Sequence, residues 1–502
     1  MSKKLFVGVL GSLLLEHGLA ASSLDTFLKG NLIPGEAVFD HLQALEDIAV
    51  RYNVNRAAGT EGHELSGNYI AQKLLAAGYN VELQPFEFKK YEKISGMFAQ
   101  VTPSEIDYQE EKDFNVMTYS GSGDFTGPVV GVDLALGAGN QSTSGCEKED
   151  FTTFPEGSIA LIQRGTCAFG DKVVHAQAAG AKAVIIFNQG NSADREELFQ
   201  GTLSEDSLIK IPVVAIAYPL AVKILETGDL TLRVAAQTKL EKKVSFNVIA
   251  ESKSGDPDNV VMLGAHLDSV AEGPGINDNG SGSAAILEVA LRLKNINANN
   301  KLRFGWFSAE ELGLIGSTKY VESLSEAEKN QISLYVNVDM VGSPNYTISV
   351  FDGDGSKFGQ KGPEGSAQIE QLFHNFFNAY GSGSVETELN GRSDYAAFSA
   401  AGIAVGGIFT GAEGIKSEAE ADLFGGEAGA PYDACYHKHC DNTKNISIEA
   451  LEINTNAIGF LAMSYAHSTQ TVRSANKMSS TVPRKEVVFP KHGDCHGDIH
   501  HE

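Results

Sequence analysis

Residues 259–294, NVVMLGAHLDSVAEGPGINDNGSGSAAILEVALRLK, indicate the architecture of the largest part of the chain. The apolar run that ends at His266 has the length and composition of a buried β-strand. A glycine-rich loop follows, and the segment SGSAAILEVALRLK then has the apolar spacing of a helix. This order of strand, loop and helix is typical of a parallel α/β sheet.

The same order recurs along the neighbouring sequence. From about Phe246 to His467, short apolar strands alternate with amphipathic helices. The strand in LRFGWFSAEELGLIGS (302–317) runs into an acidic pair, and the strand in SLYVNVDMVGS (333–343) runs into an aspartate. We therefore predict an α/β fold, with a mostly parallel or mixed sheet that is flanked by helices on both faces.

The rest of the chain divides into unequal parts. Residues 40–85 predict two helices and a strand, because GNYIAQKLLAAGYNVELQPF changes from helical to alternating spacing after Gly78. Residues 118–240 contain short β-rich runs separated by glycine turns, which predicts a β-rich α+β region. Residues 474–502 are polar and interrupted by prolines, so we predict a disordered tail there.

Composition and charge limit the classes of partner. The 502 residues are 42% hydrophobic, with 53 glycines and 14 prolines, as expected for a folded α/β protein. The chain has 39 basic and 64 acidic residues, which give a formal net charge of -25. Such a protein repels nucleic acids and anionic membranes, so we expect no nucleic acid and no membrane among its partners.

The N-terminus has the features of a secretory signal peptide. Lys3 and Lys4 precede a short apolar run, and cleavage is expected after Ala20, so residues 1–20 would form the signal peptide. No other apolar run reaches the roughly 18 residues that a membrane span requires. We therefore expect a secreted protein; because vacuolar delivery uses the same kind of signal, a vacuolar protein is the alternative.

In a secreted chain, cysteines indicate disulfides. Cys146 with Cys167 and Cys435 with Cys440 are the local candidate pairs among the five cysteines. Pairing them in this way leaves Cys495 alone in the predicted tail.

Four asparagines begin Asn-X-Ser/Thr sequons, which accept glycans in secreted proteins. Asn140, Asn345 and Asn445 are the expected glycosylation sites. Asn279 lies inside the glycine-rich loop, where a glycan would block the loop, so we expect this residue to stay bare.

Candidate catalytic residues lie where the buried strands end. Each has an ordinary explanation: a His after a strand is usually just hydrogen-bonded, and an Asp before a helix, such as Asp278, is most often an N-cap. However, three successive strands each deliver a His or an acid (His266, Glu310-Glu311, Asp339) to the same end of one sheet. The late segment PYDACYHKHCDN offers a second imidazole, from His437 or His439. Two His and three carboxylates fit two Zn²⁺ ions, for which a short carboxylate like that of Asp278 can supply the bridging ligand.

Two other classes of site explain the loop less well. A phosphate-binding loop is disfavoured, because the glycine spacing matches neither a P-loop nor a GxGxxG fingerprint and the nearby acids would repel phosphate. A Ser/His/Asp hydrolase is a weaker alternative, because the chain has no GxSxG elbow.

The ordered motifs GAHLDSV, GPGINDNGSGS, AEELGLIGS, NVDMVGSPN, GRSDYAAF and CYHKHCDN resemble those of the dizinc aminopeptidases of peptidase family M28. The chain is most similar to the secreted or vacuolar fungal leucine aminopeptidases that carry a protease-associated (PA) domain. The resemblance implies the zinc exopeptidase fold (phosphorylase/hydrolase-like) with an inserted PA domain. Residues 21–117 and 241–473 would then form the catalytic domain, and residues 118–240 the insert.

The same resemblance assigns the metal ligands. His266 and Asp339 would bind one zinc, Glu311 and His437 the other, and Asp278 would bridge the two. His439 is the rival ligand near His437, and the family pattern favours His437.

Further roles follow residue by residue from the matching motifs. Glu310 would be the general base, Asp268 would orient the imidazole of His266, and Tyr436 would donate to the oxyanion. Arg392 would help to hold substrate, Glu310 and Asp339 would receive the α-amino group, and a Cys435–Cys440 disulfide would fix the segment that carries Tyr436 and His437.

These roles imply a zinc aminopeptidase that releases leucine and other apolar residues from peptides with a free N-terminus, and we expect it to be a secreted monomer. A carboxypeptidase of the same superfamily should add basic residues for a substrate carboxylate. Related glutaminyl cyclases use a single zinc, and an inactive receptor-like relative would have lost ligands, whereas here every ligand is present.

Overall fold

The computed structural model describes residues 32–192, 195–203 and 208–473. The expected signal peptide (1–20) and tail (474–502, with Cys495) lie outside these residues. The described residues form two compact units, which we call the first unit (32–87 and 244–473) and the second unit (88–243).

The first unit begins with two helices, α3 (Gly35–Arg51) and α4 (Glu61–Ala77). The side chain of Thr60 caps α4 by accepting the N–H of His63, and Gly78 ends it in the left-handed conformation, with φ of +91°. The long strand β1 (Asn80–Thr102) follows at once. The helix–helix–strand order predicted for residues 40–85 is thus confirmed.

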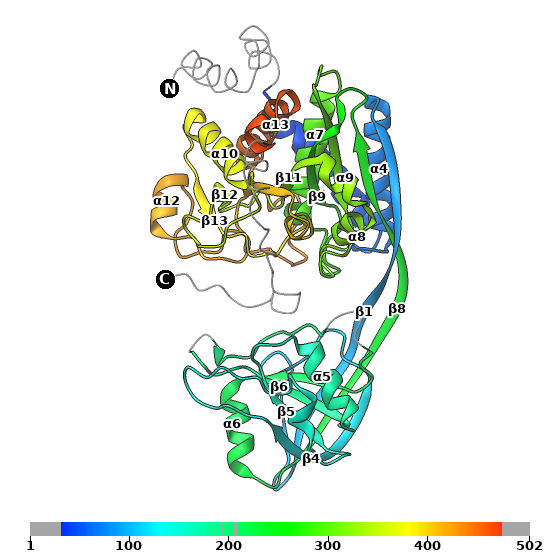
Figure 1. Ribbon diagram of the computed structural model, residues 1–502, viewed down its shortest axis with the longest axis vertical. Helices are drawn as coiled ribbons and strands as arrows, with labels where there is room; N and C mark the ends of the chain where they lie inside the picture. The colour runs from blue at the N-terminus through cyan, green and yellow to red at the C-terminus, as the bar shows by residue number, and fades with distance from the viewer. Residues whose placement is uncertain (1–31, 193–194, 204–207, 474–502) are drawn as a thin grey trace. The chain divides into compact units, whose positions relative to one another are not determined.

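The sheet of the first unit has the strand order β13-β12-β14-β11-β9-β10-β8 (Figure 1). At its centre, β9 (Asp256–His266) pairs in parallel with β10 (Asn300–Phe307) and β11 (Ile332–Val338). The other strands are β8 (Thr231–Glu251), β12 (Ser349–Phe351), β13 (Val385–Thr387) and β14 (Ala404–Phe409). Because β8 is antiparallel to β10 and β12 is antiparallel to β14, the sheet is mixed, as expected.

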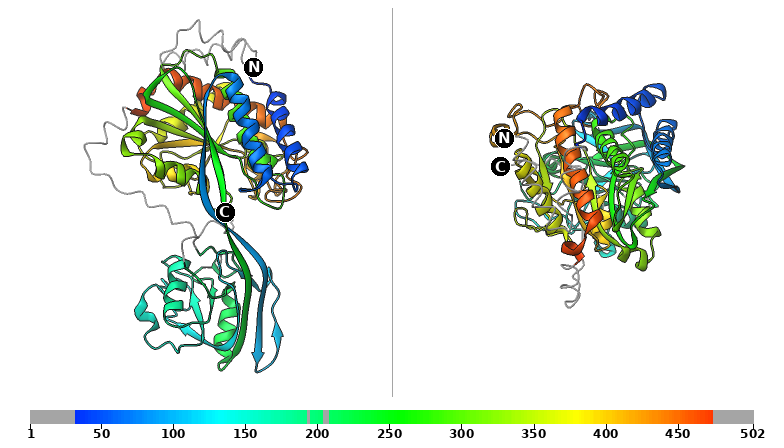
Figure 2. Two further views of the ribbon diagram at one scale, coloured as in Figure 1. Left: turned by 90° about the vertical axis from the view of Figure 1, so that its right-hand side faces the viewer. Right: turned by 90° about the horizontal axis from the view of Figure 1, so that it is seen from above.

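Both faces of this sheet are buried under helices. Val261 and Leu263 of β9 belong to one apolar cluster, whereas Val260 and Met262 belong to the cluster on the opposite face. This alternation explains why the strand reads as a continuous apolar run in the sequence. The first face packs against α3, α4, α7 (Gly282–Leu293), α10 (Ser366–Tyr380) and α13 (Ile448–His467). Figure 2 shows α13 (orange-red) beside α7.

The opposite face is covered by α8 (Ile315–Ser323) and α11 (Tyr395–Ala400), whose aromatic side chains pack on the strands. Two short helices, α9 (Glu326–Gln331) and α12 (Glu418–Phe424), begin with capping boxes at Ser325 and Ser417.

The second unit contains a sheet of order β8-β4-β5-β6-β7-β3 in which β4 to β7 are parallel. Its elements are β2 (Ile106–Asp107), β3 (Phe114–Val116), β4 (Gly123–Val132), the 3₁₀-helix η1 (Lys148–Phe151), β5 (Ile159–Gln163), α5 (Phe169–Ala178), β6 (Ala183–Phe187), β7 (Val213–Ile216) and α6 (Tyr218–Thr227). One face of the sheet packs against α5 and the other against α6.

The second unit begins earlier in the chain than the range 118–240, which is predicted from the short β-rich runs and glycine turns. Phe98 and Phe114, which precede residue 118, lie in its apolar core. No turn or loop marks the start of the unit in the sequence, because the boundary at residue 88 falls inside the continuous strand β1.

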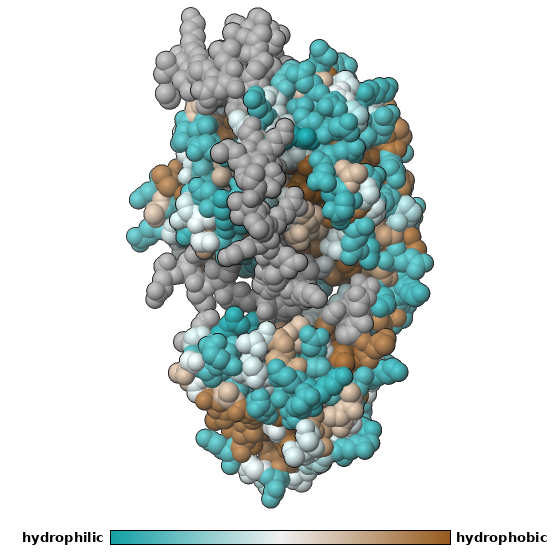
Figure 3. Space-filling view, in the orientation of Figure 1, coloured by the Kyte–Doolittle hydropathy of each residue, from teal (hydrophilic) through white to brown (hydrophobic). Residues whose placement is uncertain are grey.

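Cys146–Cys167 in the second unit and Cys435–Cys440 in the first are both disulfides in the structure, as expected. Hydrophilic residues make up most of the coloured surface on the face shown in Figure 3. Within the described residues, no helix is both long enough and apolar enough to span a membrane.

Candidate metal centre

Three parallel strands bring acidic and imidazole side chains to one edge of the first unit's sheet. His266 is the last residue of β9, Glu310 follows β10, and Asp339 directly follows β11. Because β9, β10 and β11 are parallel, their carboxyl ends share this edge. His266 and Glu310 are buried, and Asp339 is only partly exposed.

Asp278 lies between two groups of these side chains. Its Oδ1 is 3.2 Å from Nε2 of His266, and Nε2 of His266 is 3.3 Å from Oδ1 of Asp339. Its Oδ2 is 3.1 Å from Nε2 of His437, which is 3.1 Å from Oε2 of Glu311. One carboxylate therefore belongs to two donor sets, with one oxygen directed to each.

Each donor set has the composition and spacing of a metal site. The ligand atoms of His266, Asp278 and Asp339 lie within 4.8 Å of one another, and so do those of Asp278, Glu311 and His437. One imidazole nitrogen and two carboxylates per set suit Zn²⁺. Oε1 of Glu311 and Oδ1 of Asp339 are buried without a hydrogen-bond partner among the described residues, so the donor atoms fit a pair of cations.

The electrostatics of the centre favour added positive charge. Burial lowers the pKa of His437, but Glu311 and Asp278 outweigh it and raise this pKa to about 11. Burial and the charge of Asp278 raise the pKa of Glu311 to about 7. Without metal, the clustered carboxylates thus hold protons on their neighbours, and a metal cation can replace those protons.

Glu310 stands beside both sets without belonging to either. Its Oε2 is 4.0 Å from Nε2 of His266, and its side chain is about one-tenth exposed. Burial, together with the charges of Glu311 and Asp339, raises the pKa of Glu310 well above its usual range. The position leaves this carboxylate free to exchange a proton with a small molecule at the centre.

Asp268 faces the imidazole of His266 with both its backbone carbonyl and its carboxylate. The backbone carbonyl of Asp268, 3.1 Å from Nδ1 of His266, is the nearer partner of the imidazole, whereas its Oδ1 lies 3.7 Å away. The same Oδ1 accepts the backbone N–H of Glu310 at 3.2 Å. Asp268 therefore links the imidazole of His266 to the backbone of Glu310.

The loop that carries Asp278 is held by a residue that the sequence analysis did not select. Asp441 is buried, and its two carboxylate oxygens accept the N–H groups of Asn277 and Asp278 at 2.8 and 3.0 Å. Gly275 turns the loop with φ of +62°, and a Cβ on this residue would lie 2.4 Å from the carbonyl oxygen of Asp278. Only glycine fits there, as its position in the loop suggested.

Two further residues fix the centre and were also missed. Oγ of Ser393 donates to Oδ2 of Asp339 at 2.6 Å, and Nδ2 of Asn337 donates to Ser393 at 2.9 Å. Arg56 is fully buried, and its guanidinium donates to the carbonyls of Leu267, Pro274 and Gly275. Ser393 lies within the motif GRSDYAAF and could have been found there, whereas Arg56 has no comparable signal in the sequence.

The Cys435–Cys440 disulfide closes the segment that carries His437. His437 has a positive φ of +55°, and its ring stacks on that of Tyr436 at 3.8 Å between centroids. Burial raises the pKa of Tyr436 well above its usual range, so its hydroxyl keeps its proton. His439 is exposed and belongs to neither donor set.

The structure also locates Arg392, for which a substrate role was expected. Nη1 of Arg392 is 3.1 Å from Oε1 of Glu413, and the guanidinium charge opposes the rise in the pKa of Tyr436. Arg392 is therefore placed near Tyr436, with part of its charge offset by Glu413.

The asparagine side chains of the four sequons differ in their burial and in the hydrogen bonds that they donate. Nδ2 of Asn445 donates to Asp433 and Asp441, and the residue is 8% exposed, so the structure argues against a glycan at this position. Nδ2 of Asn345 donates to the carbonyls of Glu427 and Pro431, but the residue is partly exposed, so glycosylation at this position stays a prediction.

The two remaining sequons lie in contrasting surroundings. Asn140 is partly exposed, and its Nδ2 donates to Gly137 and Gln189. Asn279 is fully buried and donates to the carbonyl of Val338, which agrees with the expectation that it stays bare.

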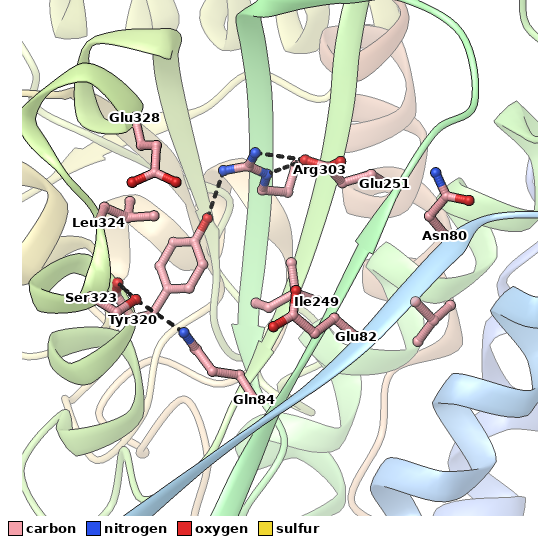
Figure 4. A pocket seen from close by; sticks show the side chains of 11 residues that line it. Asn80, Glu82, Gln84, Ile249, Glu251, Arg303, Tyr320, Ser323, Leu324 and Glu328 are labelled. Atoms are coloured by element: carbon pink, nitrogen blue, oxygen red, sulfur yellow. Dashed lines mark hydrogen bonds and ion pairs between the residues drawn. The ribbon is translucent and has the colours of Figure 1, made fainter.

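A separate pocket of about 570 Å³ in the first unit contains none of these residues (Figure 4). Arg303 crosses it, with an ion pair of 2.6 Å to Glu251 and a hydrogen bond of 2.8 Å to the hydroxyl of Tyr320. Arg303 is thus paired with Glu251, and no metal-binding set lines the pocket among the described residues.

Comparisons with known proteins agree with this geometry. Residues 247–462 match peptidase family M28, and residues 125–224 match the PA domain. An aminopeptidase of Pseudomonas aeruginosa is 52% identical over 436 residues, which cover 87% of this chain and 81% of that protein. A probable leucine aminopeptidase 2 of Aspergillus oryzae is 39% identical, with 94% and 92% covered.

Solved structures give the same result. The aminopeptidase from Aneurinibacillus sp. strain AM-1 superposes with a TM-score of 0.65 at 27% identity, over 91% of this chain and 96% of that one. The zinc aminopeptidase BSAP from Bacillus subtilis superposes with a TM-score of 0.56 at 27% identity, over 86% and 95%. The chain therefore belongs to peptidase family M28 and is a metallo-aminopeptidase with a PA domain.

Proposed function

We propose that the chain is a two-zinc aminopeptidase that releases leucine and other apolar residues from peptides with a free N-terminus. The observation that carries the proposal is the carboxylate of Asp278, whose two oxygens are directed to two separate donor sets. His266 and Asp339 would hold one zinc and Glu311 and His437 the other. The leucine preference is supported by the fungal relatives named leucine aminopeptidase 2.

Zinc bound in these sets would acidify a coordinated water and polarise the scissile carbonyl. Glu310 would accept the proton of the attacking water and later deliver it to the departing amine, since its carboxylate is beside both sets and in neither. The backbone contact of Glu310 with Asp268 keeps this carboxylate in place.

The remaining groups would bind and orient the substrate. The phenol of Tyr436 stays protonated, so it can donate to the developing oxyanion. The negative charges of Glu310 and Asp339 would attract a free α-ammonium group, which an N-acetylated peptide lacks. Arg392 would contact the substrate from beside Tyr436.

The likeness of residues 1–20 to a signal peptide and the two disulfides together support secretion. Vacuolar delivery would use the same signal. N-terminal sequencing of protein from the culture medium, compared with a cell extract, separates these destinations.

Activity on matched substrates tests the proposed function. We expect the purified protein to cleave leucine p-nitroanilide, to lose this activity after chelation, and to regain it with zinc. N-acetyl-leucine p-nitroanilide serves as the matched control and should resist cleavage. Cleavage of the acetylated substrate at a similar rate would contradict an aminopeptidase.

A further inference from the structure

A second cluster of possible metal ligands lies in the first unit, apart from the centre described above. Glu370 and His374 stand one turn apart on α10, and Glu386 lies on the edge strand β13 (Figure 1). Their ligand atoms lie within 4.8 Å of one another. Since β12 runs antiparallel to β14 and parallel to β13, the carboxyl end of β13 points away from the edge that holds His266.

The imidazole of His374 presents a free nitrogen to this cluster. Its Nδ1 is 2.8 Å from Oγ of Ser384, a contact that can fix the ring with its N–H at Nδ1 and the lone pair at Nε2. Nε2 is closed off from solvent and has no hydrogen-bond partner among the described residues. It is 3.7 Å from Oε1 of Glu370.

Glu370 contributes a buried carboxylate that is fixed in place. The side chain is 7% exposed, and its Oε2 accepts the N–H groups of Gly353 and Asp354 at 2.9 and 3.0 Å. Its other oxygen, Oε1, faces His374 and accepts no hydrogen bond from the described residues. A carboxylate on a side chain this deeply buried is normally paired with a cation or bound to a metal.

Glu386 completes the set from the neighbouring strand. Burial and the negative charge of Glu370, followed by that of Asp352, raise the pKa of Glu386. The like charges are thus incompletely balanced by the protein's own cations, although His374 and Lys357 reduce the rise.

The neighbouring acidic group, Asp352 with Asp354 and Glu370, has a different explanation. Both oxygens of Asp352 already accept backbone N–H groups, one from Ser356 and the other from Lys357 and Phe358. These hydrogen bonds fold the loop after β12, so we assign this group a structural role.

We propose that Glu370, His374 and Glu386 bind a further divalent cation, of which Zn²⁺ is the best match to one imidazole and two carboxylates. The cation would join α10 to the short edge strand β13. Glu386 is partly exposed, so water can reach the cluster from that side and complete the coordination.

The test is a difference in bound zinc between variants of the full-length protein. Each protein is dialysed against one buffered concentration of free zinc, and bound zinc per chain is measured by mass spectrometry. We expect His374→Gln and Glu386→Gln to bind one zinc fewer than the wild type while keeping its rate on leucine p-nitroanilide. Glu388→Gln, which makes the same charge change two residues away, should bind as much zinc as the wild type.

A difference between variants is the readout, so the result does not depend on how many zinc ions the catalytic centre holds. If His374→Gln and the wild type bind equal zinc, the site does not exist. If the variants fold poorly, anomalous scattering at the zinc edge from wild-type crystals decides the matter: a peak between the three side chains supports the site, and its absence at saturating zinc rejects it.

Discussion

Ser393 donates a 2.6 Å hydrogen bond to Oδ2 of Asp339, which leaves Oδ1 of the same carboxylate 3.3 Å from His266. Partners that orient metal ligands in this way typically contribute about 10–100-fold to metal affinity or activity. We therefore expect Ser393→Ala to lower zinc affinity or kcat by about that factor. Zinc affinity is measured by competition with a chelator, alongside kcat on leucine p-nitroanilide.

Ser399→Ala is the matched control for this prediction. Ser399 is also buried, on α11, but its Oγ has no hydrogen-bond partner among the described residues. We expect zinc affinity and kcat to remain within about twofold of the wild type, since no contact to the centre is removed. Equal losses in both variants would mean that Ser393 acts only through packing.

Asp278 is shared by both donor sets, whereas Glu311 and Asp339 belong to one each. Asp278→Ala should therefore lower the amount of zinc bound at both positions, and Glu311→Gln at one. Bound zinc per chain, measured against a buffered free-zinc series, distinguishes the two outcomes. Loss of equal amounts of zinc from both variants would show that Asp278 does not connect the two positions.

The variant Glu310→Gln tests whether Glu310 acts as the general base and not as a metal ligand. Because Glu310 belongs to neither donor set, the variant should keep its zinc while kcat falls by about 10²–10⁴-fold, the usual contribution of a general acid–base group. Zinc content and kcat are measured on the same preparation. A variant with full zinc and near wild-type kcat would assign the base to another residue.

Much of this centre could be predicted from local sequence. The apolar runs that end at His266 and Asp339 predict buried strands, and parallel strands place their carboxyl ends together. The choice of His437 over His439 needed the family resemblance, because both imidazoles lie between the same two cysteines. Sequence spacing alone does not show which way a side chain points in a disulfide-closed turn.

The supporting residues could not be predicted because their contacts span long stretches of chain. Arg56 contacts the carbonyl of Gly275 across 219 positions, and Asp441 contacts Asp278 across 163. Hydrogen bonds from side chains to distant backbone groups leave no periodicity in the sequence. The start of the second unit was similarly hidden, because β1 continues through residue 88.

The buried side chain of Lys172 should make the stability of the second unit depend on pH. It is fully buried, and Nζ donates to the carbonyl of Ser144 at 2.6 Å. Burial lowers its pKa from 10.5 to about 8, so between these values the unfolded chain binds more protons than the folded one. Stability should therefore rise as the pH increases from about 8 to 10.5, by up to about 3 kcal/mol.

Hydrogen exchange of α5 peptides in the full-length protein, corrected for intrinsic rates, measures this change. Lys172→Met removes the titrating group. The protection of α5 peptides from hydrogen exchange should therefore not rise in this variant over the same pH range. If protection changes with pH in the same way in the wild type and in Lys172→Met, the lysine stays protonated in the folded chain.

Arg56 offers a test of how the loop beneath the metals is held. Its buried guanidinium donates to three carbonyls of residues 267–275, and its charge lies near Asp268, Asp441 and Asp278. Arg56→Lys keeps the charge but loses the planar guanidinium with its several N–H donors, so both kcat and zinc affinity should fall. Both values should fall further in Arg56→Met, which also loses the charge. Arg303→Lys changes a guanidinium that pairs with Glu251 and should leave zinc affinity unchanged. If Arg56→Lys retains both values, charge alone holds the centre and the three carbonyl contacts contribute little.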